Sequence, residues 1–145
     1  MKAPKRTLLG GHSLALVVGA ILLLFIVQYM RSDPAKHWGS FYGNAIADWS
    51  GTFVMLIATK YLYEVGSPES RKLLPDHYPD FLHFCRAHGL TIFLLITGAG
   101  WLVAFIRMDP GSRWGQVVGN VLSEWVQILG LVLMSKYLIE KNSKV

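Results

Sequence analysis

The chain is short of cysteine and of charge, and each shortage excludes a class of protein. Cys85 is the only cysteine in 145 residues, which excludes an internal disulfide framework and a Cys-x-x-Cys metal or redox motif. Charged residues make up 16% of the chain, whereas a soluble domain carries about 25%. With 52% of its residues apolar, the chain has too little polar surface to cover itself in water. We therefore expect a membrane protein.

Catalytic motifs are missing as well. The sequence has no Gly-x-Ser-x-Gly elbow and no glycine-rich phosphate loop ending in Lys-Ser or Lys-Thr, which argues against an enzyme. The net charge of +5 could suggest nucleic acid, but the basic residues stand between long apolar runs. Anionic lipid headgroups explain such residues better. We expect the lipid bilayer as a partner and no nucleic acid.

Four apolar runs are each long enough for a membrane span, because about 20 apolar residues cross the ~30 Å hydrocarbon core as a helix. The runs are Leu8–Met30, Phe41–Tyr63, Ala87–Ile106 and roughly Trp114–Ile139. None shows the alternation of a membrane barrel, and an open sheet would leave backbone amides unpaired in lipid. The predicted fold is all-α, an antiparallel four-helix bundle of two transmembrane hairpins.

The two hairpins are predicted to be a tandem repeat within a single membrane domain, 1–145. A shift of 76 positions aligns 12–64 with 88–140 without a gap and gives 15 identities in 53 positions. The predicted units are repeat 1 at 8–64, a cytoplasmic linker at 65–80 and repeat 2 at 81–140. The first run follows basic residues, as in a signal peptide, but its counterpart in the second half indicates that it belongs to the fold.

The orientation follows from the basic residues. Two spans per repeat give both hairpins the same direction, with a pseudo-twofold axis along the membrane normal. Ten Lys and Arg residues lie at the termini, in the central segment or beside them, against four in the hairpin loops. The positive-inside rule then predicts cytoplasmic N- and C-termini in a bacterial inner membrane.

Three short motifs carry a resemblance. They are Asp48-Trp49, Lys60-Tyr61-Leu62-Tyr63-Glu64 and Gly66-Ser67-Pro68-Glu69-Ser70-Arg71. In these the chain resembles a family of small bacterial inner-membrane proteins with two repeated hairpins, catalogued only as a domain of unknown function. Thr52 stands where that family has Glu. The resemblance implies the four-helix architecture and no activity.

Polar residues near the middle of the predicted second and fourth helices form one candidate site. The set is Asp48, Glu124, Asn44, Asn120 and Gln127. Asp48 lies about 15 Å into its helix, which is half of the ~30 Å core. An ionised side chain there costs about 2.5–3.5 kcal/mol on insertion scales. One hypothesis is a path for protons or cations, and the other is hydrogen bonding that holds the helices together.

A stripe of small residues runs beside that site, and we call it the small stripe. Its members are Gly39, Gly43, Ala47, Gly51, Gly115, Gly119 and Ser123. Such spacing lets helix backbones approach closely, either between the repeats or between two copies. It favours the leading hypothesis, a non-enzymatic membrane protein that packs with itself or with another membrane protein.

The ends of the helices supply the remaining candidates. Trp38 and Trp114 on one side and Lys60 and Lys136 on the other are predicted interface anchors. Each lysine precedes a Glu by four residues, and the two could pair along the helix.

Two histidines raise the question of a cofactor. His12 and His88 occupy equivalent places in the two repeats and could be axial ligands of a haem in an electron carrier, or could simply reach the headgroups. Apart from that alternative, we expect no cofactor and no metal.

Overall fold

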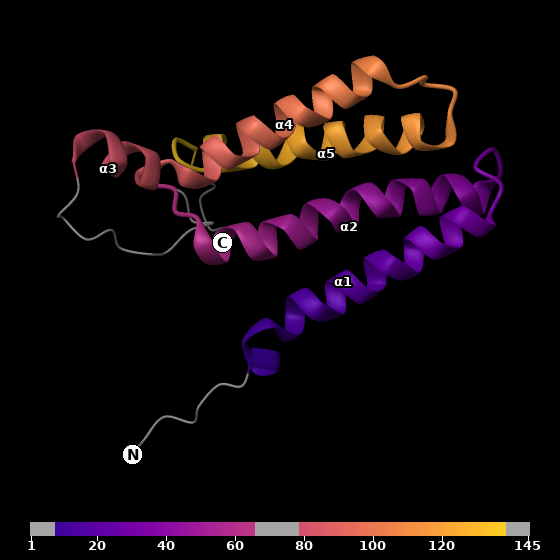
Figure 1. The fold of residues 1–145 in the computed structure, drawn as a ribbon, viewed down its shortest axis with the longest axis horizontal. Coiled ribbons are helices and arrows are strands. Elements are labelled where there is room, and N and C mark those ends of the chain that lie inside the picture. Colours follow the sequence, from indigo (N-terminus) through magenta and orange to yellow (C-terminus); the bar gives the residue numbers. More distant parts are fainter. Residues whose placement is uncertain (1–7, 66–78, 139–145) are drawn as a thin grey trace.

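The computed structural model describes residues 8–65 and 79–138, which are helical except for short connections (Figure 1). The helices are α1 (Leu8–Arg31), α2 (His37–Tyr61), α3 (Asp80–Ala87), α4 (Gly89–Arg107) and α5 (Arg113–Met134). Most of the predicted linker, 66–78, lies outside the described residues. Its last residue, Asp80, begins α3, a helix that the apolar runs did not predict.

Three helices are long and apolar enough to cross a membrane, one fewer than predicted. They are His12–Arg31 within α1, Gly89–Arg107 and Arg113–Met134. The 25 residues of α2 are long enough, but its first half carries polar and small residues, including Asn44 and Asp48, that lower its hydropathy. The prediction of an all-helical protein is confirmed, and three candidate spans are found in the described residues in place of four.

The four long helices form an open row in the order α1, α2, α5, α4 (Figure 1). In the predicted bundle they would close into a ring, but within the described residues α1 and α4 do not pack against each other. The buried residues concentrate on α2 and α5, whereas few residues of α1 and α4 are buried. Helices that are apolar all round suit a lipid environment and need no second protein neighbour.

The two hairpin turns have the same construction. The Ala35 amide donates to Asp33 Oδ1 over 3.0 Å, and the Gly111 amide donates to Asp109 Oδ1 over 2.9 Å. A Cβ on Gly39 would stand only 2.0 Å from the carbonyl oxygen of Asp33. Glycine is therefore needed where the helix meets its own turn.

The core lies along the α2–α5 contact and its border with α4. Ala47, Val121 and Trp125 are buried there, together with Leu94 of α4. The indole N–H of Trp125 donates to Thr97 Oγ1 over 2.8 Å, so the one polar atom of this ring is satisfied. This core fixes α2 against α5 and so positions the polar residues between them.

Candidate functional site

Polar side chains of α2 and α5 meet between the two helices near their middle. Asn120 Nδ2 donates a hydrogen bond to Asn44 Oδ1 over 2.5 Å. One turn farther on, Asp48 and Glu124 line a single cavity of about 130 Å³, with Ser123 and Gln127 on its wall. We call this the middle cavity. The structure thus brings together all five residues of the predicted polar site.

Two larger cavities adjoin the middle cavity along the same contact. One of about 310 Å³ lies toward the hairpin turns and shares Asn44 and Asn120 with it. The other, of about 350 Å³, lies toward the far ends of the helices and shares Glu124 with it. Asn44, Asp48 and Thr52 follow one another every fourth residue, so they share one face of α2. The cavities therefore form a groove along the α2–α5 contact, which we call the seam.

The carboxyls of the seam have no described counter-charge. Asp48 is exposed and Glu124 is half-buried. Among the residues that the structure describes, no Lys, Arg or His lies within ion-pair distance of either one, and neither carboxyl accepts a hydrogen bond from a described side chain. A Cβ on Gly51 would stand 2.7 Å from Cγ of Glu124, so glycine at this position makes room for the acid.

The small stripe makes its contacts inside the chain. A Cβ on Gly43 would meet the Tyr29 ring at 3.2 Å, and one on Gly119 would meet the Phe105 ring at 3.3 Å. Gly39 and Gly115 pack on their own hairpin turns, Ala47 is buried, Gly51 faces Glu124 and Ser123 lines the middle cavity. These residues let α1 approach α2, α4 approach α5 and α2 approach α5.

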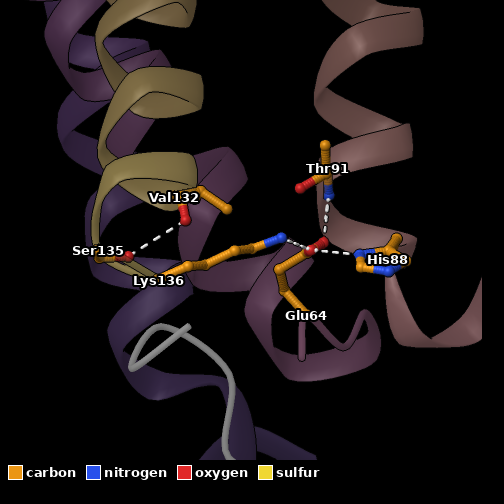
Figure 2. Close-up of polar contacts among 6 residues, drawn as sticks. All are labelled: Glu64, His88, Thr91, Val132, Ser135 and Lys136. Atoms are coloured by element: carbon orange, nitrogen blue, oxygen red, sulfur yellow. Dashed lines mark hydrogen bonds and ion pairs between the residues drawn. The ribbon is translucent and has the colours of Figure 1, made fainter. Parts of the chain in front are cut away.

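A second polar cluster joins three segments at the ends of the helices away from the hairpin turns (Figure 2). Glu64, which follows α2, is completely buried with 0% exposure. The His88 ring donates from Nδ1 to Glu64 Oε1 over 2.9 Å, and the Thr91 amide donates to Oε2 over 2.9 Å. Lys136, which follows α5, forms an ion pair with Oε1. We call this set the Glu64 cluster.

The donors of the Glu64 cluster keep its carboxyl ionised. Burial is the largest single influence and would raise the pKa of Glu64, because an apolar environment disfavours charge. The hydrogen bonds from Lys136, His88 and Thr91 together act the other way and lower the pKa below its ordinary value. The cluster is therefore a buried ion pair with its acceptor oxygens satisfied.

The Glu64 cluster corrects the predicted pairing of Lys60 with Glu64 along one helix. α2 ends at Tyr61, and extended backbone at Leu62 carries Glu64 off the helix to Lys136 of the other hairpin. The signal available in the sequence was the recurrence of His, Lys and Glu at the same places in both halves. Glu140, the predicted partner of Lys136, lies outside the described residues.

The two candidate haem ligands lie in separate surroundings. Lys60 Nζ is 3.0 and 3.1 Å from the two ring nitrogens of His12, whereas His88 bonds Glu64. His12 is on α1 and His88 precedes α4, the two outer helices of the row. The structure does not bring these imidazoles together around a common site.

The predicted anchors lie at opposite ends of the helices. Trp38 is exposed and stacks on Tyr42 with ring centroids 6.1 Å apart, and the Trp114 ring lies edge-on to Tyr29 at 5.6 Å. Tyr29 and Arg113 also bond reciprocally, since the tyrosine hydroxyl donates to the Arg113 carbonyl and the guanidinium donates to the Tyr29 carbonyl. This contact ties the end of α1 to the start of α5.

No family model matches the chain, and searches of curated proteins and of solved structures found no match. The resemblance to small repeated-hairpin membrane proteins therefore stays a prediction.

Proposed function

We propose that the chain is a non-enzymatic, four-span protein of a bacterial inner membrane that conducts protons or small cations along the seam. α2 is the fourth span in this proposal. It follows α1 after a short turn and packs between α1 and α5, both of which are candidate spans. At 25 residues and 1.5 Å per residue it is about 37 Å long, enough to cross beside them.

Contacts that recur 76 residues apart support a tandem repeat with a pseudo-twofold axis through the seam. Asn44 and Asn120 are equivalent positions, and residues that meet their own counterparts lie at such an axis. The Phe25–Trp49 ring pair has centroids 5.9 Å apart, and its counterpart, Trp101–Trp125, has 5.8 Å. With the termini in the cytoplasm, the Glu64 cluster lies on the cytoplasmic side and the hairpin turns lie outside.

One observation carries the functional proposal: Asp48 and Glu124 line the same cavity halfway along the seam. Two carboxyls at one site relieve their mutual repulsion by sharing a proton or by binding a cation. The cavities on either side provide room for water or an ion to approach from both ends.

Two alternative hypotheses, hydrogen bonding between the helices and packing with a second protein, have less support. Hydrogen bonding between the helices is supplied by the asparagine pair, and neither carboxyl contributes to it among the described side chains. The small stripe, which motivated packing with a second protein, is occupied by contacts inside the chain. The conduction hypothesis, which used Asp48 and Glu124, therefore takes first place.

Flux in proteoliposomes tests the proposal. A potential set by potassium and valinomycin drives protons inward, and an enclosed pH-sensitive dye reports them. Wild-type protein should conduct, and Asp48→Asn with Glu124→Gln should abolish flux. Asp80→Asn, an exposed acid of α3, is the matched control and should retain it. Undiminished flux in the double variant would refute a role for the two carboxyls.

Chemical labelling gives an independent test of the same site. A hydrophobic carbodiimide modifies protonated carboxyls in apolar surroundings, and mass spectrometry of peptides locates the adducts. Adducts on Asp48 or Glu124 that decline as the pH rises would support a titrating acid in the membrane. Labelling confined to other acids would count against the proposal.

A further inference from the structure

α3 is a short amphipathic helix with a bare apolar face. Phe81, Leu82 and Phe84 are 75%, 49% and 57% exposed. At 100° per residue these three fall within an arc of about 160°, His83 lies opposite the middle of that arc, and Asp80 lies at its edge beside Phe84. Three exposed large side chains on eight residues need an apolar environment that the described part of the chain does not supply.

The length of α4 fixes the depth at which α3 lies. α4 has 19 residues, which at 1.5 Å per residue span about 28 Å, nearly the whole ~30 Å hydrocarbon core. Gly89, the first residue of α4, therefore lies near one edge of the hydrocarbon core. Only His88 separates that residue from the end of α3, so α3 ends at the level of the lipid headgroups.

The junction between α3 and α4 is a defined break. His88 has φ −117° and ψ 24°, which interrupts the helix. The segment after α2 pairs with the break on both sides, since the Val65 amide donates to the Ala87 carbonyl over 2.8 Å and the Leu90 amide donates to the Tyr63 carbonyl over 3.2 Å. These bonds hold α3 as a separate helix beside the Glu64 cluster.

We propose that α3 is a membrane-surface helix that lies in the headgroup layer of the leaflet that α4 enters. Phe81, Leu82 and Phe84 face the acyl chains, His83 faces water, and Asp80 lies at the boundary between the two sides. Lipid is the occupant of this face because α3 continues directly into a candidate span, and short amphipathic helices with aromatic faces bind at that depth. The inference rests on the membrane placement proposed above.

Spin-label accessibility tests this placement in the full chain, reconstituted in phosphatidylethanolamine and phosphatidylglycerol vesicles. Cys85→Ser removes the only cysteine, and single cysteines then replace Phe81, Phe84, Asp80 or His83. Each nitroxide is exposed to oxygen, which concentrates in lipid, or to a nickel chelate, which stays in water. Positions 81 and 84 should show a higher oxygen-to-nickel accessibility ratio than position 83, and position 80 should show an intermediate ratio. The label is itself apolar, so it preserves the character of the face.

Labels at Leu95 and Ile96, exposed positions of α4, separate the possible failures. If these two positions are open to nickel, the membrane placement and the proposed function fail together. If they are in lipid while 81 and 84 are as open to nickel as 83, the surface-helix proposal alone is overturned. Inaccessibility of 81 and 84 to both reagents would also overturn it, because a protein surface would then cover the face.

Discussion

Removing the charge of Glu64 should destabilise the fold more than any other single carboxyl substitution. Glu64 is completely buried, and the side chain of its ion-pair partner Lys136 is only 10% exposed. Glu64→Gln keeps the shape but leaves the ammonium without its counter-ion. Breaking a buried pair in this way costs about 3–5 kcal/mol. At about 1.4 kcal/mol per tenfold change, the folding equilibrium constant should fall by roughly two to four orders of magnitude.

Equilibrium unfolding in mixed micelles measures this loss, with sodium dodecyl sulfate as denaturant and the five tryptophans as the fluorescent reporters. Asp80→Asn is the matched control and should stay within about 0.5 kcal/mol of wild type, because it is an exposed surface change. Adding Lys136→Met to Glu64→Gln removes the stranded charge and should recover part of the loss. A stability of Glu64→Gln equal to that of the control, or strictly additive effects in the double variant, would refute the buried pair.

The sign of the pH dependence gives a further check on the same pair. The pKa of Glu64 is lower in the folded chain than its unfolded value, about 4.3 for a free glutamate. The folded state therefore binds fewer protons, and the contribution of Glu64 is complete above that unfolded value. It is lost as the pH falls through the folded pKa. The stability difference between wild type and Glu64→Gln should shrink on acidification below about pH 4.3; a difference that grows would contradict the assignment.

Two further substitutions test contacts at the hairpin-turn ends of the helices. Gly115→Ala should destabilise the chain by about 1–3 kcal/mol, the range for overpacking, because its Cβ would stand 2.0 Å from the Asp109 carbonyl oxygen. Gly100→Ala is its control, since nothing lies within 4 Å of that Cβ, and equal unfolding midpoints for the two variants would contradict the turn geometry. Tyr29→Phe should cost about 1 kcal/mol by removing the 2.6 Å hydrogen bond to the Arg113 carbonyl, and an unchanged midpoint would show that the bond contributes nothing.

Apolar length in the sequence was enough to place four of the five helices. α1 and α4 begin and end within two residues of the predicted runs, because nearly every position in them is apolar and the runs stop at Arg31 and Arg107. α2 begins at His37, four residues before its predicted run. These four residues are less apolar than the run, and Gly39 among them packs on the hairpin turn. The polar residues between α2 and α5 were also predictable, because their equal places in two similar halves brought them to the same depth.

Three features could not be read from apolar length. The short α3 mixes charged and aromatic residues and follows three prolines, so its pattern resembles that of a connecting segment. The partner of Glu64 depends on where α2 ends, and a helix end within a few residues is not specified by hydropathy. The open row depends on which helix faces pack together. Helices as uniformly apolar as α1 and α4 have no distinct apolar face, so their sequences do not indicate on which side a neighbour packs.

The proposed tandem repeat would account for the opposite chemistry of the two polar clusters. At the proposed axis a residue meets its own counterpart, as Asn44 meets Asn120, so an acid that arises there before duplication becomes a pair of acids. Away from the axis a residue meets a different position of the other repeat, and Glu64 can then find a lysine. The off-axis pair neutralises itself and stabilises the fold. The on-axis pair, Asp48 with Glu124, has no basic partner within the described chain and needs a shared proton or a cation. We therefore expect an ion to move along the seam and not at the Glu64 cluster.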